Sequence, residues 1–207
     1  MKYVLLLLVL MVACHNPTVP DRQAAYAFDD GFGDVFRWPQ QRLPVRFYPD
    51  TRGAMRTLVE YGIAAWTAQF IYGEFNGVIW SDSATADVIV LWSGAVPADV
   101  PPDPGPPVTA CSGVTRLVTD ASGTRLDSAI VITASRLAVT ATDAQVAACF
   151  RRVITHELGH SLGLLQHSPQ NTDLMAPDPL VDAPTSRDRG TVEVLYHSTP
   201  TIGPPPR

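Results

Sequence analysis

The sequence predicts an α+β fold, in which a twisted and mostly parallel sheet with an antiparallel edge strand packs against two long helices. Apolar residues recur every three or four positions in residues 51–71, which is the period of a helix with one buried face. Residues 87–92 form a β-branched and nearly continuous apolar run, as expected for a strand buried on both faces. A second helical stripe begins near Thr142 and continues through residue 158.

Two shorter strands are expected beside the first helix. Residues 43–48 alternate between apolar and other side chains, and this strand should end at Pro49 because proline has no N–H to donate. Asp50 or Thr51 would then cap the helix that follows. Residues 78–80 form another short apolar run, which is typical of a strand.

The middle of the chain reads as a loop followed by a strand pair. Residues 97–108 contain six prolines, which excludes both a helix and a central strand. Residues 112–118 and 128–133 flank a turn-rich stretch and predict a pair of strands joined by a hairpin or a slightly longer loop.

Two helices are expected in the remainder of the chain. Thr142 followed by Gln145 is a capping-box signature at the start of the second long helix. A shorter helix is expected from about Arg187 to His197. At its end, we interpret Tyr196 as a packing residue and His197 as a solvated one.

The length of 207 residues suits one domain, which we expect to cover residues 36–198. Residues 1–13 combine a positive charge with an apolar stretch too short to span a bilayer, as in a signal peptide. Residues 14–35 mix Pro, Asp, Gly and Gln and predict a flexible tether. Residues 199–207 predict a disordered, proline-rich tail.

Cys14 follows residues that resemble a bacterial lipobox, in which the cysteine becomes the acylated first residue. Met11 departs from the usual residue there, so a plain secretory signal stays open as the alternative. Both interpretations predict export from a bacterial cell, followed by lipid anchoring in the cell envelope or by secretion. A lipid on Cys14 would be the only membrane attachment, because no other stretch is long and apolar enough to span.

Without Cys14, the even pair Cys111 and Cys149 remains in an oxidising compartment, which favours a disulfide over two buried free thiols. The formal net charge of −5 gives no indication of nucleic-acid binding. We expect a monomer.

His156, Glu157 and His160 form an HExxH motif inside the second long helix. Residues four apart lie on one helical face, so both imidazoles can reach one metal ion. Glu157 lies next to the first ligand, close enough to act on a water molecule at the ion. The alternative is a helix with two ordinary histidines, but Gly163 follows and can end the helix in a left-handed conformation that turns the chain back.

These residues resemble the metzincin clan of zinc peptidases, whose signature is HExxHxxGxxH followed by a methionine turn, and the matrixin-like branch in particular. His156, Glu157, His160 and Gly163 match the signature position by position. The position of the third ligand holds Gln166 instead, and His167 follows it.

We expect His167 to be the third ligand, because imidazole binds zinc far better than a neutral amide does. His167 also lies eight residues before Met175, which is similar to the clan's spacing from third ligand to turn methionine. No tyrosine follows Met175 at the position where some relatives place a further ligand, so three protein ligands and water are expected.

The resemblance covers most of the chain after the signal and implies a zincin-type fold and a zinc-dependent endopeptidase. One catalytic Zn²⁺ would activate water, Glu157 would be the general base, and a protein or peptide substrate would lie along residues 112–118. A second zinc is not expected, because no histidine lies between His15 and His156. Calcium sites are not predicted from these residues. A catalytically silent binding module and a hydrolase of non-peptide substrates are the alternatives.

Overall fold

The computed structural model describes residues 23–94, 110–137 and 141–206. The predicted signal peptide, Cys14 and the proline-rich loop at residues 97–108 lie outside them.

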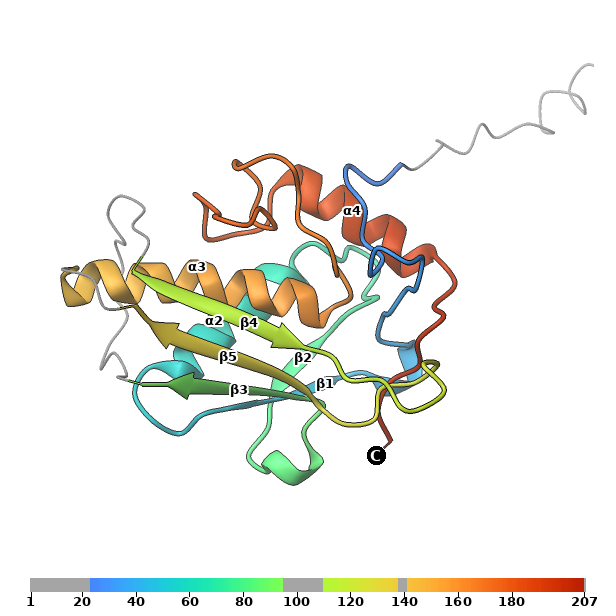
Figure 1. The fold of residues 1–207 in the computed structure, drawn as a ribbon, viewed down its shortest axis with the longest axis horizontal. Helices are drawn as coiled ribbons and strands as arrows, with labels where there is room; N and C mark the ends of the chain where they lie inside the picture. The colour runs from blue at the N-terminus through green and yellow to red at the C-terminus, as the bar shows by residue number, and fades with distance from the viewer. Residues whose placement is uncertain (1–22, 95–109, 138–140, 207) are drawn as a thin grey trace, which may run out of the picture.

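A five-stranded sheet forms the base of the molecule (Figure 1). Its strands, in the spatial order β2-β1-β3-β5-β4, are parallel except for β4, which runs antiparallel to β5 at the edge. This confirms the predicted α+β fold with its antiparallel edge strand. The strands are β1 (Val45–Pro49), β2 (Gly77–Ile79), β3 (Val88–Ser93), β4 (Cys111–Arg116) and β5 (Ile130–Arg136).

Burial along the central strands alternates, because helices cover one face of the sheet. In β3, Val88 and Val90 are fully buried while Ile89 and Leu91 are only partly covered. The prediction that this strand is buried on both faces is therefore wrong for its second face. Pro49 ends β1 as its last residue, at the end of the pairing with β3.

Three α-helices complete the fold among the described residues: α2 (Met55–Thr67), α3 (Asp143–Ser161) and α4 (Ser186–His197). The capping box of Thr142 and Gln145 begins α3 as predicted. The predicted cap of α2 is wrong, because the Asp50 carboxylate instead accepts hydrogen bonds from the backbone and guanidinium of Arg52. The helix consequently begins later, after Ala54.

Helices α2 and α3 pack against each other and against the sheet, and α4 lies on the other side of α3 (Figure 1). The Trp66 indole N–H donates to the carbonyl of Thr155 over 2.8 Å and joins the two long helices. At Gly62 an added Cβ would lie 3.2 Å from a methyl of Leu158, so the small residue lets the helices approach closely. This contact holds the segment of α3 that carries the HExxH motif.

Both ends of the described chain lie against the domain, in contrast to the predicted tether and disordered tail. Tyr26 and Ile202 are each 7% exposed. Ala25 N–H donates to the Thr191 hydroxyl of α4 over 3.1 Å, and Ile202 forms a parallel bridge with Phe36. Composition alone suggested mobile segments, but long-range hydrogen bonds and burial of these apolar side chains order residues 23–35 and 199–206.

A disulfide joins Cys111 of β4 to Cys149 of α3, the pairing that the sequence favoured, with a Cα–Cα distance of 5.9 Å. It fixes the edge strand to the first half of the long helix.

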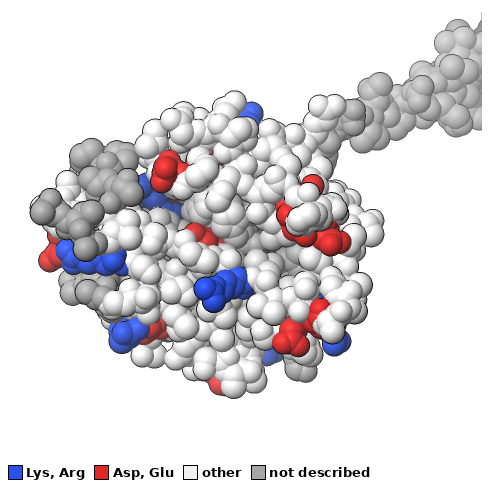
Figure 2. Space-filling view, in the orientation of Figure 1, with Lys and Arg blue, Asp and Glu red and all other residues white. Residues whose placement is uncertain are grey.

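Charged side chains of both signs are interspersed on the face in Figure 2, with no continuous basic surface among the described residues there. None of the described helices is long and apolar enough to cross a membrane.

We predict that replacing both Cys111 and Cys149 with alanine lowers the free energy of unfolding by about 3 to 4 kcal/mol. The bridge closes a loop with a sequence separation of 38, and cross-linking such a loop restricts the unfolded chain. Urea denaturation of the oxidised wild type and the variant measures the difference. Wild type treated with dithiothreitol should match the variant, and equal stability of all three samples would contradict the prediction.

Candidate active site

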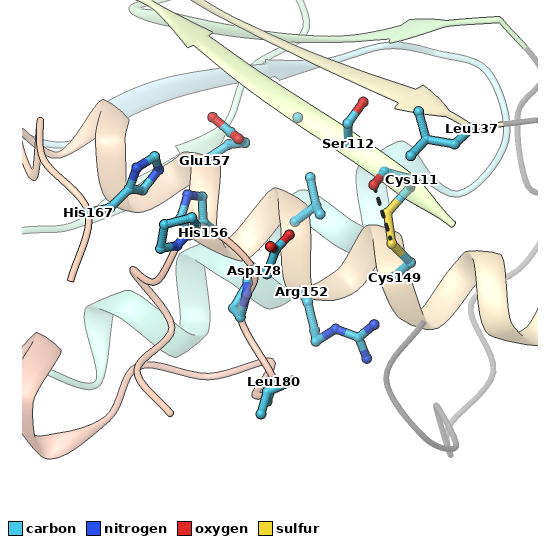
Figure 3. Close-up of a pocket in the computed structure, with 14 residues that line it drawn as sticks. Cys111, Ser112, Leu137, Cys149, Arg152, His156, Glu157, His167, Asp178 and Leu180 are labelled. Atoms are coloured by element: carbon cyan, nitrogen blue, oxygen red, sulfur yellow. Dashed lines mark hydrogen bonds between the residues drawn. A yellow bond between two sulfur atoms is a disulfide. The ribbon is translucent and has the colours of Figure 1, made fainter. Parts of the chain in front are cut away.

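A cleft runs beside α3 where that helix passes the edge strand β4. Its larger cavity has a volume of about 370 Å³ and extends from the β4 end of the disulfide to His156, Glu157 and His167 (Figure 3). A second cavity of about 290 Å³ shares Glu157 and His167 with the first and is bordered by Val114, Leu117 and Leu165. The two cavities therefore meet at the residues that the sequence singled out.

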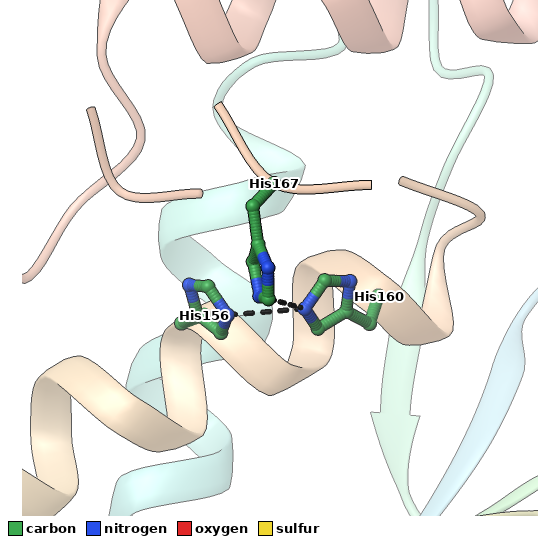
Figure 4. A group of neighbouring side chains, drawn as sticks. All are labelled: His156, His160 and His167. Carbon is green, nitrogen blue, oxygen red and sulfur yellow. Dashed lines mark hydrogen bonds between the residues drawn. The ribbon is translucent and has the colours of Figure 1, made fainter. Parts of the chain in front are cut away.

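Three imidazoles converge at this meeting point (Figure 4). The Nε2 atom of His160 lies 3.0 Å from that of His156 and 3.2 Å from that of His167. The ligand atoms of all three lie within 4.8 Å of one another. His156 and His160 come from successive turns of α3, whereas His167 comes from the loop after it.

At Gly163 the chain leaves α3 and reverses direction, so that His167 in the following loop comes close to His156 and His160. The Gly163 φ of +107° is in the left-handed region that only glycine adopts freely. The N–H groups of Gly163 and Leu164 donate to the carbonyls of His160 and Gly159, the two hydrogen bonds of a Schellman motif. An added Cβ on Gly163 would also overlap the Phe36 carbonyl oxygen. The helix-ending role expected of Gly163 thus has a geometric basis.

Backbone carbonyls fix the tautomers of two of the three histidines. His156 Nδ1 lies 2.7 Å from the carbonyl oxygen of Leu174, and His160 Nδ1 contacts that of Leu164. A carbonyl only accepts, so each Nδ1 carries the proton and each Nε2 presents a lone pair. Two acceptors facing each other at 3.0 Å repel unless a cation lies between them.

The nitrogens suit a zinc ion by both spacing and charge. Zn–N bonds of 2.0–2.1 Å in tetrahedral geometry place two ligand nitrogens about 3.3 Å apart. Burial lowers the pKa of His156 to about 4 and that of His160 to about 3, and partial desolvation lowers the pKa of the more exposed His167. All three imidazoles are therefore neutral near pH 7, which is the state that binds a metal.

Met175 packs against α3 at Gly159, in the turn that the sequence pattern indicated. The side chain is fully buried, and an added Cβ on Gly159 would overlap its sulfur and lie 2.6 Å from Trp66 Cζ2. The preceding residue, Leu174, supplies the carbonyl that holds His156. Position 159, between the two helix histidines, must therefore be glycine.

The Asp188 side chain of α4 holds the turn that contains Leu174 and Met175. Its carboxylate is fully buried and accepts hydrogen bonds from the N–H groups of Leu174 and Met175, at 2.9 and 3.2 Å. The same carboxylate accepts from the Thr185 N–H at the start of α4, at 2.8 Å, and from the Tyr26 hydroxyl, at 2.7 Å. One side chain thus joins the methionine turn, α4 and the N-terminal segment.

Glu157 faces β4 at the opening of the cleft. It is 5% exposed, and the Thr115 hydroxyl contacts its Oε2 at 2.6 Å. Burial raises the pKa of Glu157 to about 7, against the opposing effect of the Thr115 hydrogen bond. Gly113 gives the carboxylate room, because an added Cβ there would lie 2.7 Å from Glu157 Oε1. The carboxyl group of Glu157 can therefore take up and release a proton near neutral pH.

Sequence reasoning missed Gly113, Thr115 and Asp188. The first two lie in an unremarkable strand, and their contact with Glu157 spans 42 residues for Thr115. Asp188 had a visible signal, since Thr185 and Asp188 form a capping box. That signal indicates a helix start but not the additional contact with the methionine turn.

The sheet, the two long helices and a three-histidine cluster beside a buried glutamate define the zincin class of metallopeptidase folds. A model of the matrixin family matches residues 37–196, which is most of the chain, and the protein belongs to that family. No curated protein sequence matches the chain.

We predict that Asp188→Asn lowers the free energy of unfolding by about 2 to 4 kcal/mol, because the new amide group cannot accept the buried hydrogen bonds of the oxygen it replaces. Thermal denaturation measures the loss, and Asp127→Asn at an exposed position is the matched control. An unchanged melting temperature for Asp188→Asn would show that the buried carboxylate does not hold the turn.

Proposed function

We propose that the protein is a zinc-dependent endopeptidase, with His156, His160 and His167 as metal ligands and Glu157 as general base. The observation that carries the proposal is the convergence of three neutral imidazoles on one point beside a buried carboxyl group with a raised pKa. Membership of the matrixin family supports zinc as the metal and peptides as the substrate.

Zinc at this position would supply a Lewis acid that polarises a peptide carbonyl and makes a water molecule more acidic. Glu157 would accept the proton of that water at a carboxylate oxygen and then deliver it to the departing amine. The Thr115 hydroxyl keeps the carboxylate pointing into the cleft while the proton moves. The backbone carbonyls of Leu164 and Leu174 keep the imidazoles of His160 and His156 in the tautomer that leaves each Nε2 free to bind the metal.

An extended peptide suits the cleft because β4 is the terminal strand of the sheet and borders both cavities. Backbone groups along its outer edge can pair with a substrate strand, which would lay the scissile bond beside Glu157. The apolar cavity beside Val114 and Leu165 and the larger cavity beside His156 would take side chains on opposite sides of that bond.

We place this activity outside the cytoplasm, in a monomer that is secreted or attached to the cell envelope through Cys14. The disulfide between Cys111 and Cys149 supports an oxidising compartment. Mass spectrometry of the protein from a bacterial membrane fraction tests the lipid on Cys14 directly.

We predict that Glu157→Gln abolishes casein cleavage, lowering it by at least about 100-fold, while one zinc per chain is retained. Glutamine has nearly the same shape but cannot accept the proton of a water molecule. His167→Ala should instead weaken zinc binding, because it removes a ligand. Elemental analysis and a casein assay on the same samples separate these two effects. Zinc binding without any cleavage by the wild type would favour a silent binding module, and a wild type without zinc would contradict the proposal.

Thr115→Val should lower kcat by about 10-fold without changing the zinc content. Valine keeps the shape of the side chain but removes the hydroxyl that orients Glu157, and misplaced catalytic groups lose rate rather than metal. Thr133→Val, on the neighbouring strand β5, is the control. Equal kcat values for the wild type and Thr115→Val would show that the hydroxyl has no positioning role.

A further inference from the structure

We propose that the N-terminal segment at Phe28 and Asp29 is a positioning element for the third metal ligand, His167, and that Asp29 acts through Gln166. The inference rests on the proposed zinc site and adds residues to it that lie far away in the sequence.

His167 differs from the other two ligands in how it is held. His156 and His160 are each fixed by a backbone carbonyl at Nδ1. Among the described residues, no hydrogen bond reaches Nδ1 of His167, and its side chain is exposed. The position of its ring therefore depends on the backbone on either side of it.

Hydrogen bonds from the N-terminal segment fix the backbone before His167. The N–H of Leu165 donates to the carbonyl of Phe28 over 3.0 Å. The side-chain amide of Gln166 donates to Asp29 Oδ1 over 2.9 Å. Asp29 Oδ1 also accepts from the N–H of Gly31 at 2.7 Å, which orients the carboxylate within its own turn. Leu165 and Gln166, the two residues before His167, are thus hydrogen-bonded to a segment that lies more than a hundred residues earlier in the sequence.

The backbone after His167 is fixed from the other side. The N–H of Ser168 donates to the carbonyl of Met175 over 2.8 Å, which connects the ligand loop to the methionine turn. His167 consequently lies between two anchors, one in the methionine turn and one in the N-terminal segment. Loss of either anchor would leave an exposed imidazole on a looser loop.

The N-terminal segment is itself firmly attached, as a positioning element must be. Besides the Tyr26 contact with Asp188, the Arg187 guanidinium of α4 donates to the Ala25 carbonyl over 3.1 Å. Further along, Phe36 passes so close to Gly163 that a side chain there could not be accommodated. The segment therefore contacts this turn both at the end of α3 and immediately before His167.

This arrangement explains why Gln166 stands where the metzincin signature has its third histidine. Consecutive residues point in different directions here: Gln166 toward Asp29 and His167 toward the other imidazoles. The additional residue before the ligand serves as the attachment point for the N-terminal segment.

Zinc affinity of the complete mature protein tests the proposal, measured by competition with a chromogenic chelator. We expect Asp29→Ala and Gln166→Ala each to weaken zinc binding by about 3- to 10-fold, below the 10- to 100-fold typical of a direct partner of a ligand. The double variant should be no weaker than the single variants, because both remove the same contact. Asp29→Asn, whose amide oxygen still accepts from Gln166, should restore the wild-type affinity.

Asp30→Ala is the matched control, because within the described part of the chain the Asp30 carboxylate accepts hydrogen bonds only from its own turn, from the N–H groups of Phe32 and Asp34. The melting temperature of each metal-free variant separates positioning from general destabilisation. Wild-type affinity in both alanine variants, or a loss that follows the metal-free melting temperature, would overturn the proposal. Failure of the wild type itself to bind zinc would instead refute the proposed function.

Discussion

The buried carboxylate of Asp188 is the interaction on which the geometry of the site depends. A fully buried aspartate is stable only when its oxygens are hydrogen-bonded, and here they accept from the methionine turn, from the start of α4 and from the Tyr26 hydroxyl. Because the turn is held, the Leu174 carbonyl is held, and this carbonyl sets the tautomer of His156. Asp188 thereby determines, through the methionine turn, how His156 presents its lone pair.

The three histidines are placed by three different pieces of backbone. His160 is held by the turn that Gly163 makes possible, and His156 is held by the methionine turn. His167 depends on hydrogen bonds of its neighbours on both sides. Helix α3 alone would therefore bring two imidazoles together, but the complete site requires the folded surroundings of the helix. On the opposite side of the cleft, Thr115 and Gly113 of β4 position Glu157 in the same indirect manner.

Local patterns in the sequence predicted much of this architecture. Helical periodicity located both long helices, and the spacing of the HExxH motif placed two imidazoles on one face of α3. Ligand chemistry favoured His167 over Gln166, and the structure brings His167 to the other two histidines. Contacts between distant segments were not predictable: Tyr26 and Asp188 are 162 residues apart, and the polar composition before Phe36 suggested a tether. Burial and hydrogen bonding override composition where a segment finds partners in the folded state.

X-ray absorption at the zinc edge is the most direct test of the metal site, because it reports the ligands themselves. With zinc bound to the wild type, we expect three imidazole nitrogens at 2.0–2.1 Å together with one oxygen ligand. In Gln166→His, the histidine of the metzincin signature would be restored, yet the spectrum should keep three imidazoles because His167 already fills the third position. A spectrum of the wild type with only two imidazoles, or with sulfur ligands, would contradict the three-histidine site.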